Sequence, residues 1–208
     1  MTQTRLLIGA DVRCTDGDLG RLHRIIVDPV HNRLTHLAVK PDELQSGRLA
    51  PASLIASAGV DILLRCTTAE FARLEPAEET SPQHTASWPY VSDERGGRFP
   101  AGVEGIERDT GYGNRTVTRD RIPDGGVEIR RGETLHATDG DAGRVQGLII
   151  DLPQTYLTHL LAGVGRLFGR RQIAVPIGSV TGFGDGIQLN LSREQVRALP
   201  ELAAHPTS

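Results

Sequence analysis

The chain has 208 residues, of which 38% are hydrophobic and 24% are charged, and its formal net charge is −3. This composition is typical of a folded globular protein, and the slightly acidic balance argues against a dedicated nucleic-acid-binding protein. No run of about 18 apolar residues occurs, so we expect no membrane-spanning helix.

Short strands joined by tight turns are predicted for the first third of the chain. Asp16-Gly17-Asp18 is expected to form a hairpin turn, because glycine accepts the positive φ that such turns need. Asn32 suits a left-handed position in the next turn, and Pro51 indicates a strand end or a sheet edge. We expect strands over residues 12–15, 20–28, 34–40, 48–54 and 60–66.

A short helix is predicted to follow the last of these strands. Thr67 and Glu70 have the spacing of a capping box, in which each side chain accepts a hydrogen bond from a backbone amide of the first turn. Phe71 and Leu74 lie three residues apart and therefore share one face of the helix.

The same pattern recurs 123 residues later, where residues 132–162 align without a gap with residues 9–39. Thirteen of the 31 aligned positions are identical. The match resumes at an offset of 125, where Pro51 aligns with Pro176. A second capping box, Ser192 to Gln195, aligns with the first. We therefore predict two copies of one unit, copy one over residues 1–76 and copy two over residues 128–208.

The segment between the copies, residues 77–127, has neither strand nor helix periodicity. It is rich in glycine, proline and charge, which is typical of a linker or a disordered segment. It nevertheless holds Trp88, Tyr90, Phe99 and Tyr112, half of the eight aromatic residues of the protein. We expect parts of it to pack against the folded copies, with Trp88 and Tyr90 as anchors.

The repeated residues resemble those of the PRC-barrel family. The resemblance rests on Thr-Asp-Gly-Asp-x-Gly-Arg in both copies, Ile-Ile-x-Asp in copy one, Leu-Thr-His-Leu in both, and Val-Pro-Ile-x-Ser-Val in copy two. It does not cover the segment between the copies. The residues that carry it are Asp16, Gly17, Gly20, Asp28 and His36 in copy one, and Asp139, Gly140, Gly143, Asp151, His159 and Pro176 in copy two.

The resemblance implies an all-β fold of two small β-barrels, each ending in a short α-helix and joined by a long irregular linker. We expect the barrels to pack about a pseudo-twofold axis, with a homodimer as a further possibility. The family includes the cytoplasmic part of the photosynthetic reaction-centre H subunit and the C-terminal domain of the ribosome-maturation factor RimM. In these settings the barrel is an adaptor that binds other proteins.

The candidate site residues have plain structural interpretations. Asp16 and Asp18 lack the further oxygen ligands that a calcium loop needs, so we expect no metal there. His36 and His159 are predicted to be partly buried, hydrogen-bonded strand residues. Asp28 and Asp151 are predicted to accept hydrogen bonds from turn amides.

Cys14 and Cys66 align with Ala137 and Leu191, which indicates ordinary core packing. Two cysteines make no disulfide framework, so a reducing, cytoplasmic setting is expected.

A partner surface is suggested by the loop that carries Arg166, Phe168, Arg170 and Arg171. These side chains either bind an acidic partner or form a solvated face. Trp88 and Tyr90 are the other candidate contacts.

The sequence predicts a non-enzymatic module that binds a protein partner and uses no cofactor. One alternative is a ribosome- or RNA-associated factor like RimM, against which the acidic balance counts. The other is a peripheral component of a membrane electron-transfer complex like the H subunit, although the chain shows no anchor.

Overall fold

The computed structural model describes residues 2–41, 46–83, 90–92, 98–100, 115–165 and 171–202. The chain forms two compact units. The main unit consists of Met1–Glu78 and Arg121–Ser208, and the insert unit consists of Glu79–Asp120. The described residues are mostly β-strand, and none of their helices is long and apolar enough to cross a membrane.

Copies one and two fold into the same order of elements in the main unit. Copy one comprises β1 (Thr2–Leu7), β2 (Asp11–Cys14), β3 (Gly17–Asp28), β4 (Arg33–Pro41), β5 (Arg48–Pro51), a 3-10 helix η1 (Ala52–Leu54), β6 (Ile55–Ala58), β7 (Ile62–Leu64) and α1 (Thr68–Ala72). Copy two comprises β12 (Val127–Arg130), β13 (Thr134–Ala137), β14 (Gly140–Leu152), β15 (Tyr156–Val164), β16 (Arg171–Pro176), η2 (Ile177–Ser179), β17 (Val180–Gly184), β18 (Gly186–Leu189) and α2 (Arg193–Ala198).

The insert unit contains two antiparallel strand pairs. The pairs are β8 (Glu78–Gln83) with β11 (Arg115–Asp120), and β9 (Tyr90–Ser92) with β10 (Arg98–Pro100). The sequence pattern did not predict these strands, because their side chains show no clear alternation.

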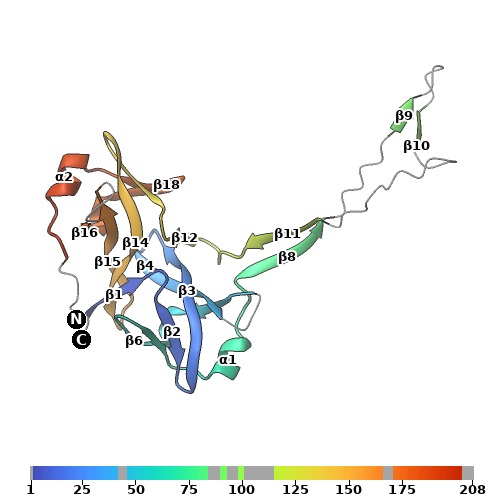
Figure 1. Cartoon of the computed structure of the whole chain (residues 1–208), viewed down its shortest axis with the longest axis horizontal. Helices are drawn as coiled ribbons and strands as arrows, with labels where there is room; N and C mark the ends of the chain where they lie inside the picture. The colour runs from blue at the N-terminus through green and yellow to red at the C-terminus, as the bar shows by residue number, and fades with distance from the viewer. Residues whose placement is uncertain are drawn as a thin grey trace. The chain divides into compact units, whose positions relative to one another are not determined.

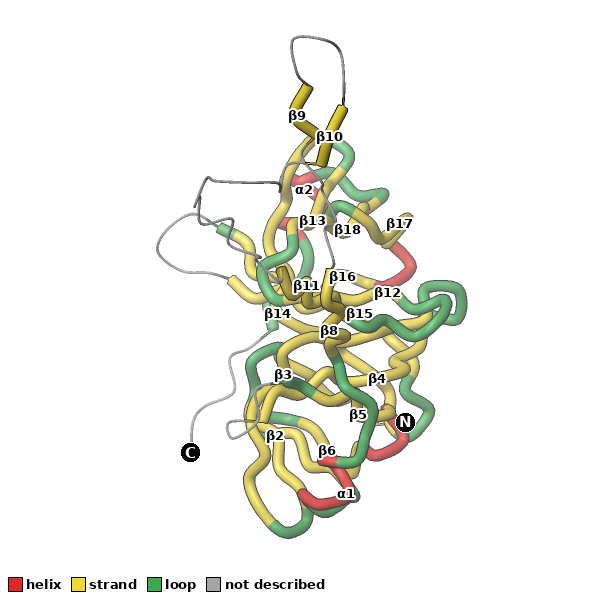
Figure 2. The backbone as a smooth tube through the Cα atoms, turned by 90° about the vertical axis from the view of Figure 1, so that its right-hand side faces the viewer, coloured by secondary structure: helices red, strands yellow, loops and turns green. Residues whose placement is uncertain are grey.

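The strands of the main unit form one curled, barrel-like sheet of 14 strands. Its central order runs β17-β18-β13-β14-β15-β4-β3-β2-β7-β6, so the two copies meet where β15 lies beside β4. Figure 1 shows this sheet, and Figure 2 shows α1 with β2 and β6 at one end and α2 with β13 and β18 at the other.

Each copy receives its first strand from the other copy. β1 of copy one pairs with β14 of copy two, with Leu6 opposite Leu148. β12 of copy two pairs with β3 of copy one, with Ile129 opposite Ile25. These two pairs are equivalent at the offset of 123, so the exchange is reciprocal and in register.

The exchanged strands carry core residues. Leu6 and Ile129 are fully buried within one hydrophobic cluster that draws on both copies. Burying such a side chain contributes about 1.5–3 kcal/mol. A Cβ on Gly147 would lie 2.0 Å from the carbonyl oxygen of Leu6, so a glycine is needed where β1 crosses β14. The exchange explains why copies predicted as separate barrels form one compact unit.

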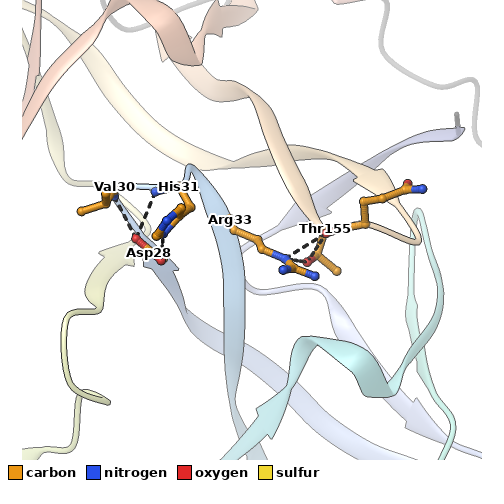
Figure 3. A network of polar contacts seen from close by, with 6 residues as sticks. Asp28, Val30, His31, Arg33 and Thr155 are labelled. Atoms are coloured by element: carbon orange, nitrogen blue, oxygen red, sulfur yellow. Dashed lines mark hydrogen bonds and ion pairs between the residues drawn. The ribbon is translucent and has the colours of Figure 1, made fainter.

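The pairing at the junction obeys the same twofold relation. Arg33 of β4 lies opposite Tyr156 of β15, and these two residues are counterparts at the offset of 123. Their neighbours form reciprocal bonds, Leu34 N to Thr155 O (2.9 Å) and Leu157 N to Asn32 O (2.8 Å). Both acceptor residues, Asn32 and Thr155, have positive φ, as predicted for Asn32. Figure 3 shows Arg33 donating to Thr155 across this junction.

Several predicted boundaries differ from the observed ones. The predicted strand over residues 48–54 is β5 followed by η1, and β6 comes directly after it. β1 and β12 were missed, because each pairs with the other copy and neither has a local hairpin partner. The short helices start at the predicted capping boxes, and both boxes have both of their hydrogen bonds.

Candidate functional site

A cleft of about 520 Å³ opens beside the exchanged strand β12, in the copy-one half of the main unit. It lies where the middle of β3 and the end of β4 meet the β1–β2 turn and the β12–β13 turn. We call it the basic cleft, and it is lined by Ile8, Gly9, Arg21, Leu22, His23, Lys40, Pro41, Arg130 and Arg131.

The lining of the basic cleft contains five basic side chains, from three arginines, one lysine and one histidine, and no carboxylate. Arg21, His23, Lys40 and Arg131 are exposed, and Arg130 is half-buried. Arg21 is partnered by the exposed Asp11, at 3.2 Å. Within the described part of the chain, Lys40, His23 and Arg131 make no ion pair. The cleft therefore presents unneutralised positive charge on a partly apolar floor.

The register of β3 and β4 places Arg21 opposite Lys40. The strands approach closely just before this pair, because Gly20 has a φ of 150° and a Cβ there would lie 2.2 Å from the carbonyl oxygen of Lys40. His23 is the extra residue of a β-bulge between Leu22 and Arg24. The bulge adds a third polar side chain to this edge.

The turn that carries Arg130 and Arg131 is held by Glu133. Its Oε1 accepts a hydrogen bond from the amide of Arg130, at 3.1 Å. Burial raises the pKa of the Glu133 carboxyl. The arginines of the turn are thus fixed at the end of β12, which itself pairs with β3.

A buried ion pair lies behind the cleft. Arg24 is 1% exposed, and its Nη1 lies 3.4 Å from Oε2 of Glu128, whose other oxygen lies 2.5 Å from Arg130. Arg24 also donates from Nη2 to the carbonyl oxygen of Ala77. Burial lowers the pKa of Arg24, and Glu128 opposes that shift.

The corresponding place in copy two has different chemistry. Lys40 and His23 correspond to Gly163 and Gln146, and Arg130 and Arg131 correspond to Leu7 and Ile8. Gln146 accepts a hydrogen bond from Gln172, at 2.9 Å. Arg144, the counterpart of Arg21, donates to the carbonyl oxygen of Gly132, at 3.0 Å. Among the described residues, the counterparts of Lys40, His23, Arg130 and Arg131 in copy two are therefore uncharged.

The predicted turn aspartates have a role that the sequence did not reveal. The hairpins form, but their turns lie at Thr15–Asp16 and Thr138–Asp139, one residue before the predicted span, because Gly17 and Gly140 already begin β3 and β14. In addition, each aspartate accepts hydrogen bonds from the first residue of the helix that ends its own copy, Thr68 for Asp16 and Arg193 for Asp139. The described residues contain no group of three side chains that could hold a metal ion.

The aspartates at the strand ends differ between the copies. Asp28 accepts hydrogen bonds from the amides of Val30 and His31, as predicted, and from the His31 ring (Figure 3). Asp151 does not make the predicted hydrogen bonds. Its Oδ1 is buried without a hydrogen-bond partner among the described residues. The two turns differ because Leu152-Pro153 follows Asp151, so the turn residue after Leu152 has no amide N–H to donate.

The predicted histidines are half-buried strand residues. His159 Nδ1 lies 3.1 Å from Thr158 Oγ1, in agreement with the predicted hydrogen bond. Nδ1 of His36 is buried without a hydrogen-bond partner in the described part of the chain, so the predicted hydrogen bond is not made at this nitrogen. Each histidine lies opposite the repeated proline, His36 opposite Pro51 and His159 opposite Pro176, which accounts for the repeat of both residue types.

The other glycines of the motif, Gly20 and Gly143, sit where strands approach closely. A Cβ on Gly143 would lie 2.8 Å from the carbonyl oxygen of Gly163, which parallels the contact of Gly20 with Lys40.

Most of the predicted partner surface lies outside the described residues. This holds for Arg166, Phe168, Arg170 and Trp88, and for the side chain of Tyr90. Arg171 starts β16 and forms an exposed ion pair with Glu201, at 2.9 Å.

Neither a protein-family model nor a curated protein matches this sequence. The basic cleft was missed from the sequence, because its basic side chains come from three separate segments, β3, β4 and the end of β12 with the turn that follows it. The one available signal was Lys40, the single lysine of the chain, in a position that copy two fills with glycine.

Proposed function

We propose that this chain is a tandem PRC-barrel-type interaction module that binds an acidic segment of a protein partner in its basic cleft. The observation that carries the proposal is the convergence of Arg21, His23, Lys40 and Arg131 on one cleft whose lining has no carboxylate. The module acts by binding and performs no chemistry on its partner. The PRC-barrel assignment rests on the repeated sequence motif and on the mostly β main unit.

The size and surface of the cleft favour a short peptide segment. Its volume of about 520 Å³ accommodates several side chains. Ile8, Leu22 and Pro41 give it apolar contact area between the charges. A segment in which aspartate or glutamate alternates with apolar residues matches both features.

The charge distribution argues for a peptide over an extended nucleic acid. Nucleic-acid grooves track a backbone with many phosphates along a basic stripe. Here the basic cleft is lined by five basic side chains, on a protein whose formal net charge is −3. A short acidic segment can neutralise them without bringing further phosphates against an acidic surface.

The expected affinity is modest. Exposed ion pairs contribute roughly 0.2–1 kcal/mol each. A few such pairs plus apolar contact therefore give a dissociation constant in the micromolar to millimolar range. Binding must weaken with salt, because the charges lie at a solvated surface.

Fluorescence anisotropy with a labelled peptide of alternating glutamate and leucine tests the proposal. The double variant Arg21→Gln/Lys40→Gln is expected to bind about 2- to 30-fold more weakly than the wild-type chain. The matched control is Arg144→Gln, which removes the counterpart of Arg21 in copy two and is expected to leave the affinity unchanged.

Two further arms separate the possible ligands. The first arm uses a labelled single-stranded RNA. If the RNA binds more tightly than the peptide, and the cleft variant loses this RNA binding, the ligand is RNA and the peptide assignment is wrong. Equal peptide affinity in the wild type and the cleft variant would show that the peptide does not bind in the basic cleft.

A further inference from the structure

The two cysteines of copy one lie in contact inside the core. Cys14 ends β2, and Cys66 follows β7 by two residues. Their Sγ atoms are 3.8 Å apart, and the residues are 5% and 6% exposed. The backbone holds them together, because the amide of Thr15 donates to the carbonyl oxygen of Cys66, at 3.0 Å.

From this contact we infer that Cys14 and Cys66 form a reversible dithiol–disulfide pair, which makes the core of copy one a site of oxidative modification. Hydrogen peroxide is the oxidant class that the reaction needs. One thiolate attacks the peroxide, giving a sulfenic acid and releasing water after proton transfer. The second thiol then displaces the hydroxyl as a second water, so two thiols and one peroxide yield one disulfide and two waters.

Burial keeps the pair reduced at rest. It raises the pKa of both thiols, and that of Cys14 to about 12. Since the thiolate is the nucleophile, the folded dithiol reacts slowly with oxidants. Reaction therefore requires local opening, and the five-residue helix α1, which starts two residues after Cys66, is the short element beside the pair.

The disulfide closes a long loop. It covalently links the β2–β3 hairpin to the base of α1, 52 residues along the chain, where Asp16 already contacts Thr68. A cross-link over a loop of this length stabilises a fold chiefly by restricting the unfolded chain. Copy two has Ala137 and Leu191 in the two positions, so only copy one has this device.

The inference is tested by titrating the full chain with hydrogen peroxide under native conditions. We expect both free thiols to be lost together, with the intact mass falling by two hydrogen atoms and with a linked Cys14–Cys66 peptide after digestion. The product stays monomeric, its unfolding midpoint rises by about 5–10 °C, and dithiothreitol reverses both changes.

The matched variant is Cys14→Ala, which installs the residue found at this position in copy two. It is expected to fold and to show no rise in midpoint on peroxide treatment. The inference is overturned if wild-type oxidation gives an intermolecular disulfide or stops at sulfinic or sulfonic acid. It is equally overturned if the native thiols stay reduced at peroxide concentrations that oxidise the unfolded chain to the disulfide.

Discussion

The carboxylate of Asp16 caps a helix that starts 52 residues later. Its Oδ1 accepts a hydrogen bond from the backbone amide of Thr68, at 2.8 Å, and its Oδ2 accepts one from the Thr68 hydroxyl, at 3.0 Å. The same relation recurs between Asp139 and the amide of Arg193, at 2.7 Å. A helix has unsatisfied amides in its first turn, so the turn of each copy completes the helix of that copy.

Replacing Asp16 by alanine is expected to lower the unfolding midpoint and to fray α1. The Thr68 amide bond lowers the pKa of Asp16, so the ionised carboxylate stabilises the fold above its unfolded pKa of about 3.9. This contribution is lost as the pH falls through the lower, folded pKa. Thermal unfolding from pH 7 to pH 2 measures both effects.

The control for this prediction is Asp18→Ala, which removes an exposed ion pair with Arg13 and leaves the helix amides bonded. Asp16→Asn should keep part of the amide bond and fall between the wild type and the alanine variant. A midpoint for Asp16→Ala equal to that of Asp18→Ala would show that the cap contributes nothing.

The helix caps made by Asp16 and Asp139 are among the features that the sequence did not predict. The two hairpins β2–β3 and β13–β14 and the capping boxes Thr67–Glu70 and Ser192–Gln195 follow from local patterns, and the structure confirms them. The Asp16–Thr68 bond and the strand exchange depend on which distant segments meet. Local periodicity carries no information about which distant segments meet. The repetition of the aspartate in both copies was the one sequence signal for a shared structural role.

The buried pair of Arg24 and Glu128 is expected to be strongly coupled. Glu128→Ala removes the carboxylate that lies 3.4 Å from the buried guanidinium of Arg24, which should destabilise the fold by about 3 kcal/mol. The double variant Arg24→Met/Glu128→Met should recover much of that loss, because it removes both charges at similar volume. Urea unfolding of the wild type, Arg24→Met, Glu128→Met and the double variant measures the coupling.

The comparison for this cycle is the exposed pair of Arg121 and Glu75, at 3.9 Å. Glu75→Ala is expected to change stability by less than about 1 kcal/mol. The coupling is refuted if Glu128→Ala costs no more than Glu75→Ala.

His36 is expected to make the protein less stable in mild acid. Burial lowers its pKa below the ordinary value of about 6.5. As the pH falls below that value, the unfolded chain binds a proton that the folded chain refuses, so stability decreases until the folded pKa is reached. His36→Gln should flatten the stability curve just below about pH 6.5. An unchanged slope in that window, measured by urea unfolding, would exclude His36 as its source.

The strand exchange predicts that the two copies hold together without a covalent link. A protease site is placed between Phe99 and Arg115, and the folded chain is cleaved there. The N-terminal fragment needs β12 on its β3, and the C-terminal fragment needs β1 on its β14. Because Leu6 and Ile129 are fully buried by the exchange, the fragments should co-elute as one species at micromolar concentration and separate only in denaturant.

Leu6→Ala provides the graded test of that association. Loss of a fully buried leucine costs about 2–5 kcal/mol, which raises the dissociation constant of the cleaved fragments by at least about 30-fold. Val30→Ala, at an 80% exposed position, should leave the constant unchanged. Two barrels that close independently would instead give fragments that separate after cleavage, each still folded. That result would restore the sequence-based expectation of separate barrels.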